Sequence, residues 1–291
     1  MQTKLDGKSH EVVIGPDRPF VMIGEKINPT GNKKLAAALQ QGELDIVRKL
    51  AERQVAWGAD VLDLNVGVPG LDEVEMITRV VRLVSEAVDV PLCIDSGRSD
   101  ILAAGLGACG GKPLVNSVNA EEKQLDAILP VVKERGAAVI GLTIDDGGIP
   151  KTPEGRVTAA GKIIQRASKM GIPPEDIVID PLVLTVGSDS HAAMVTLKSI
   201  ALIRKEFGVN INLGASNVSF GLPDRLTVNQ AFLAMAIEAG ATCSITDPIR
   251  LGATIRASDL LLGRDDFGMR YIKHFRTVEG LREKERSAPV P

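Results

Sequence analysis

Residues 61–67 read VLDLNVG, a short apolar run that ends in the carboxamide of Asn65. Seven further runs of this kind are spaced along the chain and alternate with helical stretches. Short β-branched runs that alternate with helical patterns are typical of βα units and a parallel sheet. Eight such units in succession predict one α/β domain, a single (β/α)8 TIM barrel. The predicted strands are Val21–Ile27, Val61–Val66, Leu92–Asp95, Leu114–Val118, Ala138–Ile144, Ile177–Leu182, Ile211–Ala215 and Cys243–Thr246.

Polar side chains stand where these runs end. The run from residue 211 leads to Ser216 and Asn217, and the other seven end in a carboxamide or a carboxylate. A TIM barrel keeps its chemistry at the carboxyl ends of its strands, so this ring predicts a site at the barrel mouth. A single Asp or Asn there is equally well explained as the N-cap of the next helix. The seven are Asn28, Asn65, Asp95, Asn116, Asp145, Asp180 and Asp247.

Composition narrows the function classes. The net charge of −3 without a Lys/Arg-rich stripe, and an aromatic content of only 3%, argue against nucleic acid as a partner. The polar amino terminus and the lack of a long apolar stretch predict a cytoplasmic protein with no membrane partner. Three scattered cysteines and three distant histidines predict no metal site.

The chain divides into three predicted parts. Residues 1–20 are an N-terminal extension, residues 21–275 the barrel, and residues 276–291 a charged tail that is expected to be loose or to contact another subunit. Within the barrel, a glycine precedes several predicted strands at the point where a helix must end. These glycines are Gly58, Gly136, Gly171, Gly208 and Gly240.

Three features suggest other chemistries. Residues 105–110, GLGACG, match a dinucleotide-binding fingerprint, but a helical stretch precedes them and a strand follows, so tight helix–strand packing is favoured. His191, in a loop, is interpreted as a structural histidine rather than a catalytic one. Lys26 and Lys151 raise the question of a Schiff base. Neither has a nearby base in sequence, so both are interpreted as barrel-mouth or surface charges.

Four strand-end residues together indicate a ligand. Asp95, Asn116, Asp180 and Asn217 offer carboxylates that accept hydrogen bonds and carboxamides that both donate and accept. A planar heterocycle with adjacent amino, ring N–H and carbonyl groups, such as a pterin, needs such partners. Six motifs then resemble the successive strand-end motifs of pterin-binding, corrinoid-dependent methyltransferases: GEKIN (24–28), DLNVG (63–67), CIDS (93–96), VNSVNAE (115–121), IDPL (179–182) and GASNVS (214–219).

This resemblance runs from about Val21 to Lys273 and is strongest to methyltetrahydrofolate:corrinoid protein methyltransferases. It extends more weakly to the folate module of cobalamin-dependent methionine synthase and to dihydropteroate synthase. It implies that Asp95, Asn116 and Asp180 hold the pterin ring. It also implies that Asn217 lies on a mobile loop and reaches N5, so that Asn217 and Asp95 are the candidate catalytic residues.

The resemblance implies roles for three further residues. Arg225 is expected to meet the p-aminobenzoyl or glutamate part of folate, and Gly214 and Ser216 to shape the backbone under the ring. One branch of the family, which serves a corrinoid iron–sulfur protein, has a glutamine three residues after the mobile asparagine. Here that residue is Phe220, which favours methyltransferases that unload a corrinoid protein during demethylation of a growth substrate.

The implied activity is methyl transfer between N5 of tetrahydrofolate and corrinoid cobalt, forming 5-methyltetrahydrofolate in one-carbon metabolism. No Asp-x-His-x-x-Gly motif surrounds a histidine, so the corrinoid is expected on a partner protein, and the resemblance implies a homodimer. The alternatives are the reverse direction, onto a corrinoid iron–sulfur protein, and a dihydropteroate synthase-like enzyme, although its Lys-containing Gly-rich loop and Arg-x-His cluster are not evident. A folate-binding subunit without activity and a generic barrel aldolase or isomerase are less favoured.

Overall fold

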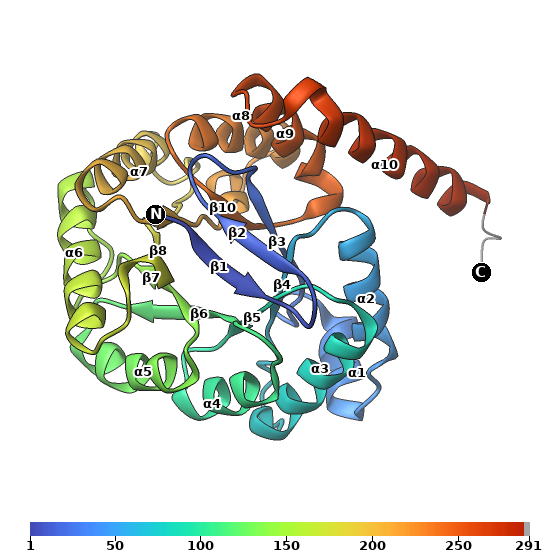
Figure 1. The fold of residues 1–291 in the computed structure, drawn as a ribbon, viewed down its shortest axis with the longest axis horizontal. Coiled ribbons are helices and arrows are strands. Elements are labelled where there is room, and N and C mark those ends of the chain that lie inside the picture. The colour runs from blue at the N-terminus through green and yellow to red at the C-terminus, as the bar shows by residue number, and fades with distance from the viewer. Residues whose placement is uncertain (288–291) are drawn as a thin grey trace.

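A computed structural model describes residues 1–287. Eight parallel strands stand in the order β10-β3-β4-β5-β6-β7-β8-β9, so sequence neighbours are neighbours in the sheet. Helices surround them, as Figure 1 shows, and the predicted TIM barrel is confirmed. The strands are β3 (Val21–Ile27), β4 (Val61–Leu64), β5 (Leu92–Asp95), β6 (Leu114–Asn119), β7 (Ala138–Leu142), β8 (Ile177–Asp180), β9 (Asn210–Ile211) and β10 (Cys243–Thr246).

Hydrogen bonds between β10 and the segment that follows β9 close the barrel. The backbone N–H of Ile245 donates to Leu213 O at 3.0 Å, and the Ser244 hydroxyl donates to the same oxygen at 2.7 Å. The predicted strand Ile211–Ala215 is too long, because the chain leaves the sheet after Ile211. It turns there so that the Gly214 N–H reaches the carboxyl group of Asp180.

Two apolar layers hold the barrel. Inward-facing residues such as Val61, Leu114 and Val178 fill its interior, and a larger layer fills the space between the strands and the helices. Because side chains alternate along a strand, the residues two positions beyond the inward-facing ones also point inward, at the next level toward the mouth. Those positions carry polar residues.

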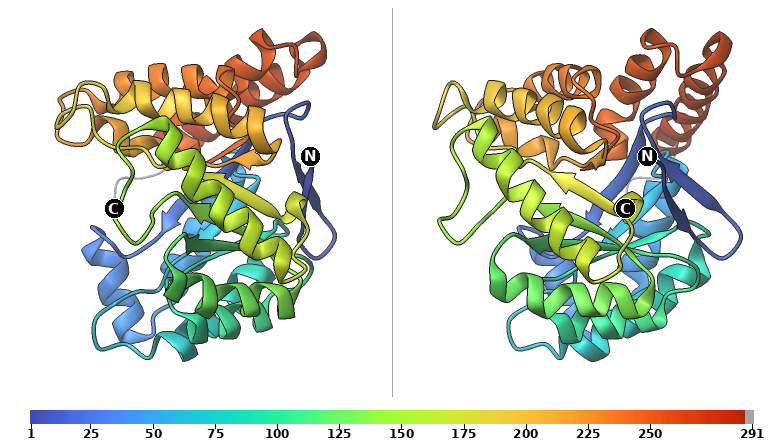
Figure 2. Two further views of the ribbon diagram at one scale, coloured as in Figure 1. Left: turned by 90° about the vertical axis from the view of Figure 1, so that its left-hand side faces the viewer. Right: turned by 60° about the vertical axis from the view of Figure 1, so that its left-hand side comes forward.

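A β-hairpin that sequence reasoning did not predict covers the N-terminal end of the barrel. It consists of β1 (Thr3–Asp6) and β2 (Glu11–Ile14), paired antiparallel, and lies across the barrel in Figures 1 and 2. Leu5, Val12 and Ile14 pack into the interior cluster, and Asn210 Nδ2 donates to Ile14 O at 3.0 Å. The barrel floor is therefore sealed, which leaves the other end for ligands.

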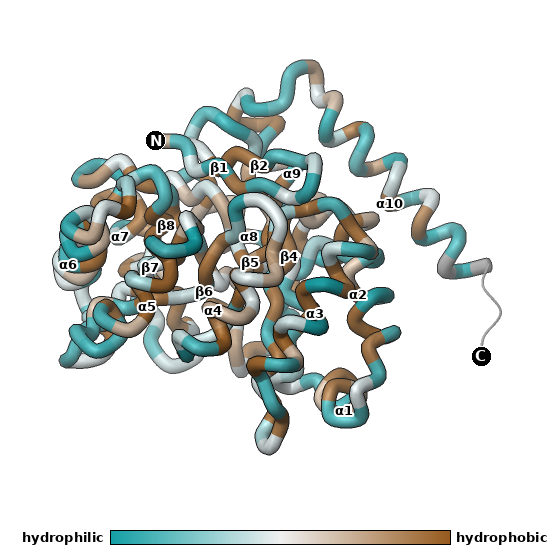
Figure 3. Tube along the Cα trace, turned by 60° about the horizontal axis from the view of Figure 1, so that its bottom comes forward, coloured by the Kyte–Doolittle hydropathy of each residue, from teal (hydrophilic) through white to brown (hydrophobic). Residues whose placement is uncertain are grey.

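Apolar residues of the outer helices pack against the sheet, and Figure 3 shows hydrophobic and hydrophilic residues interspersed along these helices. Each predicted helix-ending glycine has a positive φ, from 60° at Gly136 to 116° at Gly240, as helix termination requires. No helix among residues 1–287 is long and apolar enough to cross a membrane. The helices are α1 (Lys33–Gln41), α2 (Asp45–Ala56), α3 (Glu73–Ala87), α4 (Ser99–Ala108), α5 (Glu122–Arg135), α6 (Pro153–Lys169), α7 (Ala192–Phe207), α8 (Arg225–Glu238) and α9 (Pro248–Leu261), with 3-10 turns η1 (Pro174–Asp176), η2 (Ala215–Ser219) and η3 (Asp266–Gly268).

The last helix, α10 (Met269–Ser287), projects from the barrel in Figure 1. It is continuous through residue 276, where the tail was predicted to begin, and residues 288–291 of that tail lie outside the described part of the chain. The Asp265 carboxylate fixes its start by accepting from the backbone N–H groups of Arg270 and Tyr271 at 2.9 and 2.8 Å. The charged C-terminal segment is thus helical up to Ser287.

Candidate functional site

Strand alternation assembles one level of polar side chains at the barrel mouth. Each member lies two residues beyond a buried strand residue, for example Asp95 beyond Cys93 and Asn116 beyond Leu114, and Asn212 directly follows β9. These side chains therefore point into the barrel, and the layer of residues beneath them is largely apolar. Its members are Asp63, Asp95, Asn116, Asp180 and Asn212.

Two carboxyl groups from neighbouring strands, the buried Asp63 and the half-buried Asp95, share one side of this level. Asn65 Nδ2 donates to Asp95 at 3.0 Å, and Asn116 Nδ2 donates to Asp63 at 3.2 Å. Burial raises the pKa of both carboxyls, and the Asp95 charge raises that of Asp63 further. Since no cation pairs with either group among residues 1–287, the pair resists double ionisation at neutral pH. One carboxyl then remains a hydrogen-bond donor while the other accepts.

Asp180 lies in a separate network on β8. It accepts from the backbone N–H of Leu182 and from Asn212 Nδ2, both at 2.8 Å, and from the N–H of Gly214. Burial raises its pKa to about 6, although these hydrogen bonds and the Arg156 charge oppose the rise. Asp180 is therefore mostly ionised at neutral pH.

The buried guanidinium of Arg156 supports this network. It donates to Leu182 O at 2.8 Å and to the Thr196 hydroxyl at 3.1 Å, so it holds the loop that follows β8. Its side chain is 1% exposed, which makes it part of the wall rather than a free cation.

The largest open space at the mouth, about 750 Å³, lies over the carboxyl pair. Asp63, Asp95 and Asn116 line its inner side, with Asn28 and Lys26 among the other lining residues. A carboxylate, a carboxamide and a protonated carboxyl together match the adjacent N–H, amino and carbonyl groups of a pterin edge. The residues present thus fit a pterin ring. No group of three or more His, Cys, Asp or Glu within the described chain could hold a metal ion.

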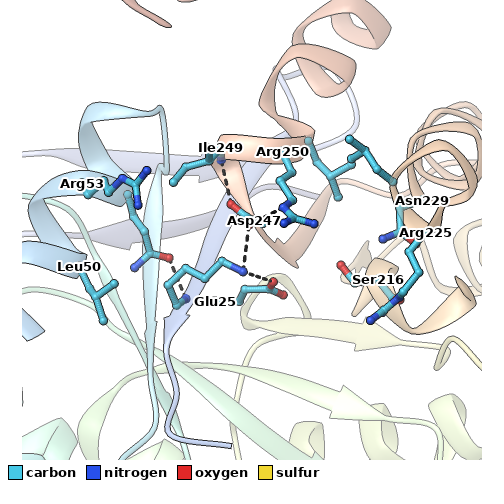
Figure 4. A pocket seen from close by; sticks show the side chains of 13 residues that line it. Glu25, Leu50, Arg53, Ser216, Arg225, Asn229, Asp247, Ile249 and Arg250 are labelled. Carbon is cyan, nitrogen blue, oxygen red and sulfur yellow. Dashed lines mark hydrogen bonds and ion pairs between the residues drawn. The ribbon is translucent and has the colours of Figure 1, made fainter. Parts of the chain in front are cut away.

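A second cavity of about 520 Å³ adjoins the first at Glu25 and Lys26, which line both. Lys26 Nζ pairs with Glu25 at 3.1 Å and with Asp247 at 2.9 Å (Figure 4). Burial lowers the Lys26 pKa, but the two carboxylates outweigh burial and raise the pKa above its ordinary value. The protonated amine is a poor nucleophile, in keeping with its interpretation as a barrel-mouth charge.

The loop after β9 carries the remaining predicted residues. Asn217 is exposed in η2, and a Cβ atom on Gly214 would lie 3.2 Å from its Nδ2, so its side chain lies close over that glycine. Ser216 and Arg225 line the second cavity. The structure thus brings Asp95 and Asn116 to the first cavity, Ser216 and Arg225 to the second, and Gly214 to Asp180. Asn217 is not among the residues that line either cavity.

The other singled-out residues have structural surroundings. The His191 side chain is 85% exposed at the start of α7, and Asp145 forms a turn by accepting from the Gly147 N–H at 2.8 Å. Gly105 is packed so closely that a Cβ would lie 2.9 Å from Ile94 Cγ2, which confirms helix–strand packing as the reason for this glycine. Lys151 is exposed.

Sequence reasoning missed three site residues: Asp63, Asn212 and Arg156. Asp63 stands inside an apolar run, and the available signal is its phase, since it follows inward-facing Val61 by two residues as Asp95 follows Cys93. The same alternation from Asn210 points to Asn212. Arg156 lies on α6, and the sequence around it does not indicate that its guanidinium points inward.

Comparison with known proteins identifies a family and several relatives of this chain. The family described as "Pterin binding enzyme" matches residues 24–247. Methylcorrinoid:tetrahydrofolate methyltransferase of Eubacterium limosum is 34% identical over 88% of this chain and 96% of its own. Methionine synthase of Mycobacterium tuberculosis is 31% identical over 80% of this chain, which spans only 21% of that protein. The solved 7,8-dihydropteroate synthase of Vibrio fischeri ES114, 19% identical over 90% of this chain and 99% of its own, has the same fold with a TM-score of 0.70.

Proposed function

The chain belongs to the family of pterin-binding enzymes, and we propose that it is a methyltransferase acting between N5 of tetrahydrofolate and the cobalt of a corrinoid protein. In the proposed direction a corrinoid protein delivers the methyl group released from a demethylated substrate, and 5-methyltetrahydrofolate is the product. The 34% identity with methylcorrinoid:tetrahydrofolate methyltransferase, over nearly the whole of both chains, is the observation that carries this proposal. The polar level at the barrel mouth supplies the groups that a pterin requires.

The proposed roles follow from hydrogen-bonding capacity. Asp95, Asn116 and Asp180 hold the pterin ring, and burial raises the pKa of Asp95 above its ordinary value. Asn217 reaches N5 from η2 and donates a hydrogen bond there. A tertiary amine leaves poorly unless the negative charge that builds on it is relieved, so a bond that strengthens in the transition state accelerates transfer in either direction.

We propose that the corrinoid protein docks around the barrel mouth, because its cobalt must reach the bound pterin. Exposed apolar residues on the loops there support this docking: Phe220 is 67% exposed, Ile149 38% and Leu184 37%. Phe220 also stands where one branch of the family has a glutamine, which supports the demethylation direction. The Phe220 ring lies 5.6 Å from the guanidinium of Arg225, the first residue of α8.

We further propose a cytoplasmic homodimer working in one-carbon metabolism. The support for self-association is a group of exposed apolar residues around the end of α9 and the start of α10, far from the loops of the barrel mouth in sequence. Its most exposed members are Leu261 at 85%, Phe267 at 96%, Met269 at 66% and Phe275 at 54%. Sedimentation equilibrium at micromolar concentration tests this, and a monomer would contradict it.

The test of the activity is an anaerobic absorption spectrum of free cobalt(I) corrinoid mixed with 5-methyltetrahydrofolate monoglutamate and the protein. The reaction is reversible, so protein-dependent formation of methylcobalt(III) supports the proposed transfer. Loss of that conversion in Asn217→Ala would assign the step to Asn217. Absence of conversion with free corrinoid and with a purified corrinoid protein, together with condensation of p-aminobenzoate onto a pterin diphosphate, would replace the proposal with a dihydropteroate synthase.

A further inference from the structure

The loop between β8 and α7, residues 181–191, connects two parts of the proposed site. It begins directly after Asp180, which holds the pterin ring in the proposed function, and its middle contacts η2, which carries Asn217. Methyl transfer requires that Asn217 stand at a fixed distance from the bound ring, since a small displacement of a catalytic group lowers the rate steeply. The loop after β8 is therefore in a position to set that distance.

The start of this loop is held at Leu182, on both sides of the residue. The Leu182 N–H donates to Asp180 at 2.8 Å, and its carbonyl accepts from Arg156 Nη1 at 2.8 Å and from the Thr196 hydroxyl at 2.9 Å. Leu182 has a φ of 66°, a left-handed conformation that a residue with a side chain adopts at a cost. Such a conformation persists where its surroundings enforce it, so these contacts fix the direction in which the loop leaves β8.

Thr185 joins the middle of the loop to η2. Its hydroxyl donates to Phe220 O at 2.7 Å. One residue further on, the Val186 N–H donates to Val218 O at 2.9 Å. The two acceptors lie one and three residues beyond Asn217 in the sequence, so the loop holds the backbone that follows Asn217.

The backbone that precedes Asn217 is held separately, by α8. Arg225 Nη2 donates to Ser216 O at 2.8 Å, which fixes that side of η2. The other side depends on the loop after β8, and the two loops approach closely there: a Cβ atom on Gly187 would lie 3.2 Å from Phe220 O. The hydroxyl of Thr185 is the side-chain group in this contact, so a substitution can remove it and leave both backbones intact.

We propose that Thr185 is a positioning residue for methyl transfer: its bond to Phe220 O holds η2 where the Asn217 carboxamide meets N5 of the pterin. Thr185 lines neither cavity, so it acts through η2 and not by contact with the ligand. The inference rests on the proposed function, because it takes Asp180 to hold the ring and Asn217 to reach N5. It adds to that function the residue that keeps these two groups in register.

The experiment measures single-turnover methyl transfer from 5-methyltetrahydrofolate monoglutamate to free cobalt(I) corrinoid, with the protein in excess over folate and the corrinoid concentration varied. Thr185→Val keeps the shape of the side chain and removes its hydroxyl. Its maximum rate is expected to fall about three- to tenfold, the effect of losing one hydrogen bond between uncharged groups. Thr185→Ser keeps the hydroxyl and should transfer methyl within about twofold of the wild-type rate.

Binding should not change with the rate. The dissociation constant of 5-methyltetrahydrofolate, from anaerobic calorimetry, is expected to stay within about twofold of wild type in Thr185→Val, because an interaction made only in the transition state is affected. The corrinoid concentration at half-maximal rate should also stay within about twofold. A loss confined to either binding constant would assign Thr185 to ligand or corrinoid binding and overturn the inference.

Thr158→Val is the matched control. Thr158 is an exposed residue of α6 whose hydroxyl donates to Glu154 O at 3.1 Å, so the same atoms change away from the loop after β8. Its rate and affinity should equal those of the wild-type protein. A wild-type rate in Thr185→Val would overturn the inference, as would a loss that Thr185→Ser fails to restore. Failure of the wild-type protein itself to transfer methyl would refute the proposed function and the inference with it, so the two failures are distinguishable.

Discussion

Ionisation of Asp180 should control pterin affinity near pH 6. In the free protein, burial raises its pKa from 3.8 to about 6, which corresponds to about 3 kcal/mol at 1.36 kcal/mol per pH unit. Because the folded-state pKa of Asp180 lies above the ordinary value, this residue lowers the free energy of unfolding as pH rises from 3.8 to about 6. The full cost to folding applies above that range. A pterin that donates N–H groups to the carboxylate should offset this cost.

Binding therefore requires the ionised carboxylate, and below pH 6 it must release a proton. The wild-type dissociation constant for tetrahydrofolate should be about tenfold larger at pH 5 than at pH 7.5 from this group alone. Asp180→Asn keeps the shape but cannot ionise, and loss of a charge-assisted hydrogen bond of about 1.5–3 kcal/mol should weaken binding by about 10- to 150-fold at pH 7.5. The ratio of variant to wild-type constants should then shrink about tenfold at pH 5.

Anaerobic calorimetry in two buffers of different ionisation enthalpy measures both the affinity and the proton release. Titration of the ligand itself, and of Asp63 and Asp95, occurs in both proteins and cancels in the ratio. A ratio that stays constant from pH 5 to 7.5 would refute the assignment of Asp180 to the pterin edge.

Three further changes probe the site and its frame. Asn217→Ala should bind 5-methyltetrahydrofolate within about twofold of wild type yet transfer methyl about 100-fold more slowly, because its bond to N5 strengthens only in the transition state; an unchanged single-turnover rate would remove it from the mechanism. Gly105→Ala should destabilise the protein by about 1–3 kcal/mol in urea unfolding, since its Cβ would meet Ile94, whereas Gly280→Ala, with nothing within 4 Å, should be neutral or slightly stabilising. Asp259→Asn should lower the free energy of unfolding by about 3–5 kcal/mol. This carboxylate is 1% exposed, accepts from the Phe20 N–H and lies 3.9 Å from each of Arg256, Arg264 and Arg270. The control Asp100→Asn, at an exposed position, should change the free energy of unfolding by less than about 0.5 kcal/mol.

The barrel was predictable from sequence because its signal is repeated eight times. The bounds of β3, β5 and β10 are those predicted, since each run is apolar, short and closed by a polar residue or a turn. The hairpin β1–β2 was not predicted, because its strands are four residues long and polar on one face. Only its contacts with the barrel interior make it stable, and such long-range contacts leave no local pattern in the sequence.

The candidate site was partly predictable for the same reason. Asp95 ends β5, Asn116 lies within β6, and both line the first cavity. Asp145 ends a predicted run but serves a turn, because the chain leaves β7 at Leu142 before reaching it. Asp247 has two roles, as the N-cap of α9, accepting from the Ile249 N–H at 3.0 Å, and as a partner of Lys26. A strand-end position thus indicates where a side chain begins, while the fold of the following loop decides where it points.

The carboxyl pair of Asp63 and Asp95 adds a reason for proposing that this level binds a ligand. Asp259, which is also buried, has three cations at 3.9 Å, from Arg256, Arg264 and Arg270. Asp63 and Asp95 receive carboxamide donors but no cation within residues 1–287, and burial raises the pKa of each. Such a pair costs folding free energy in the empty protein, and a ligand with several N–H donors removes that cost. The protein should therefore gain thermal stability from tetrahydrofolate, and more of it at pH 7.5 than at pH 5, because the cost of ionising this buried pair grows as pH rises.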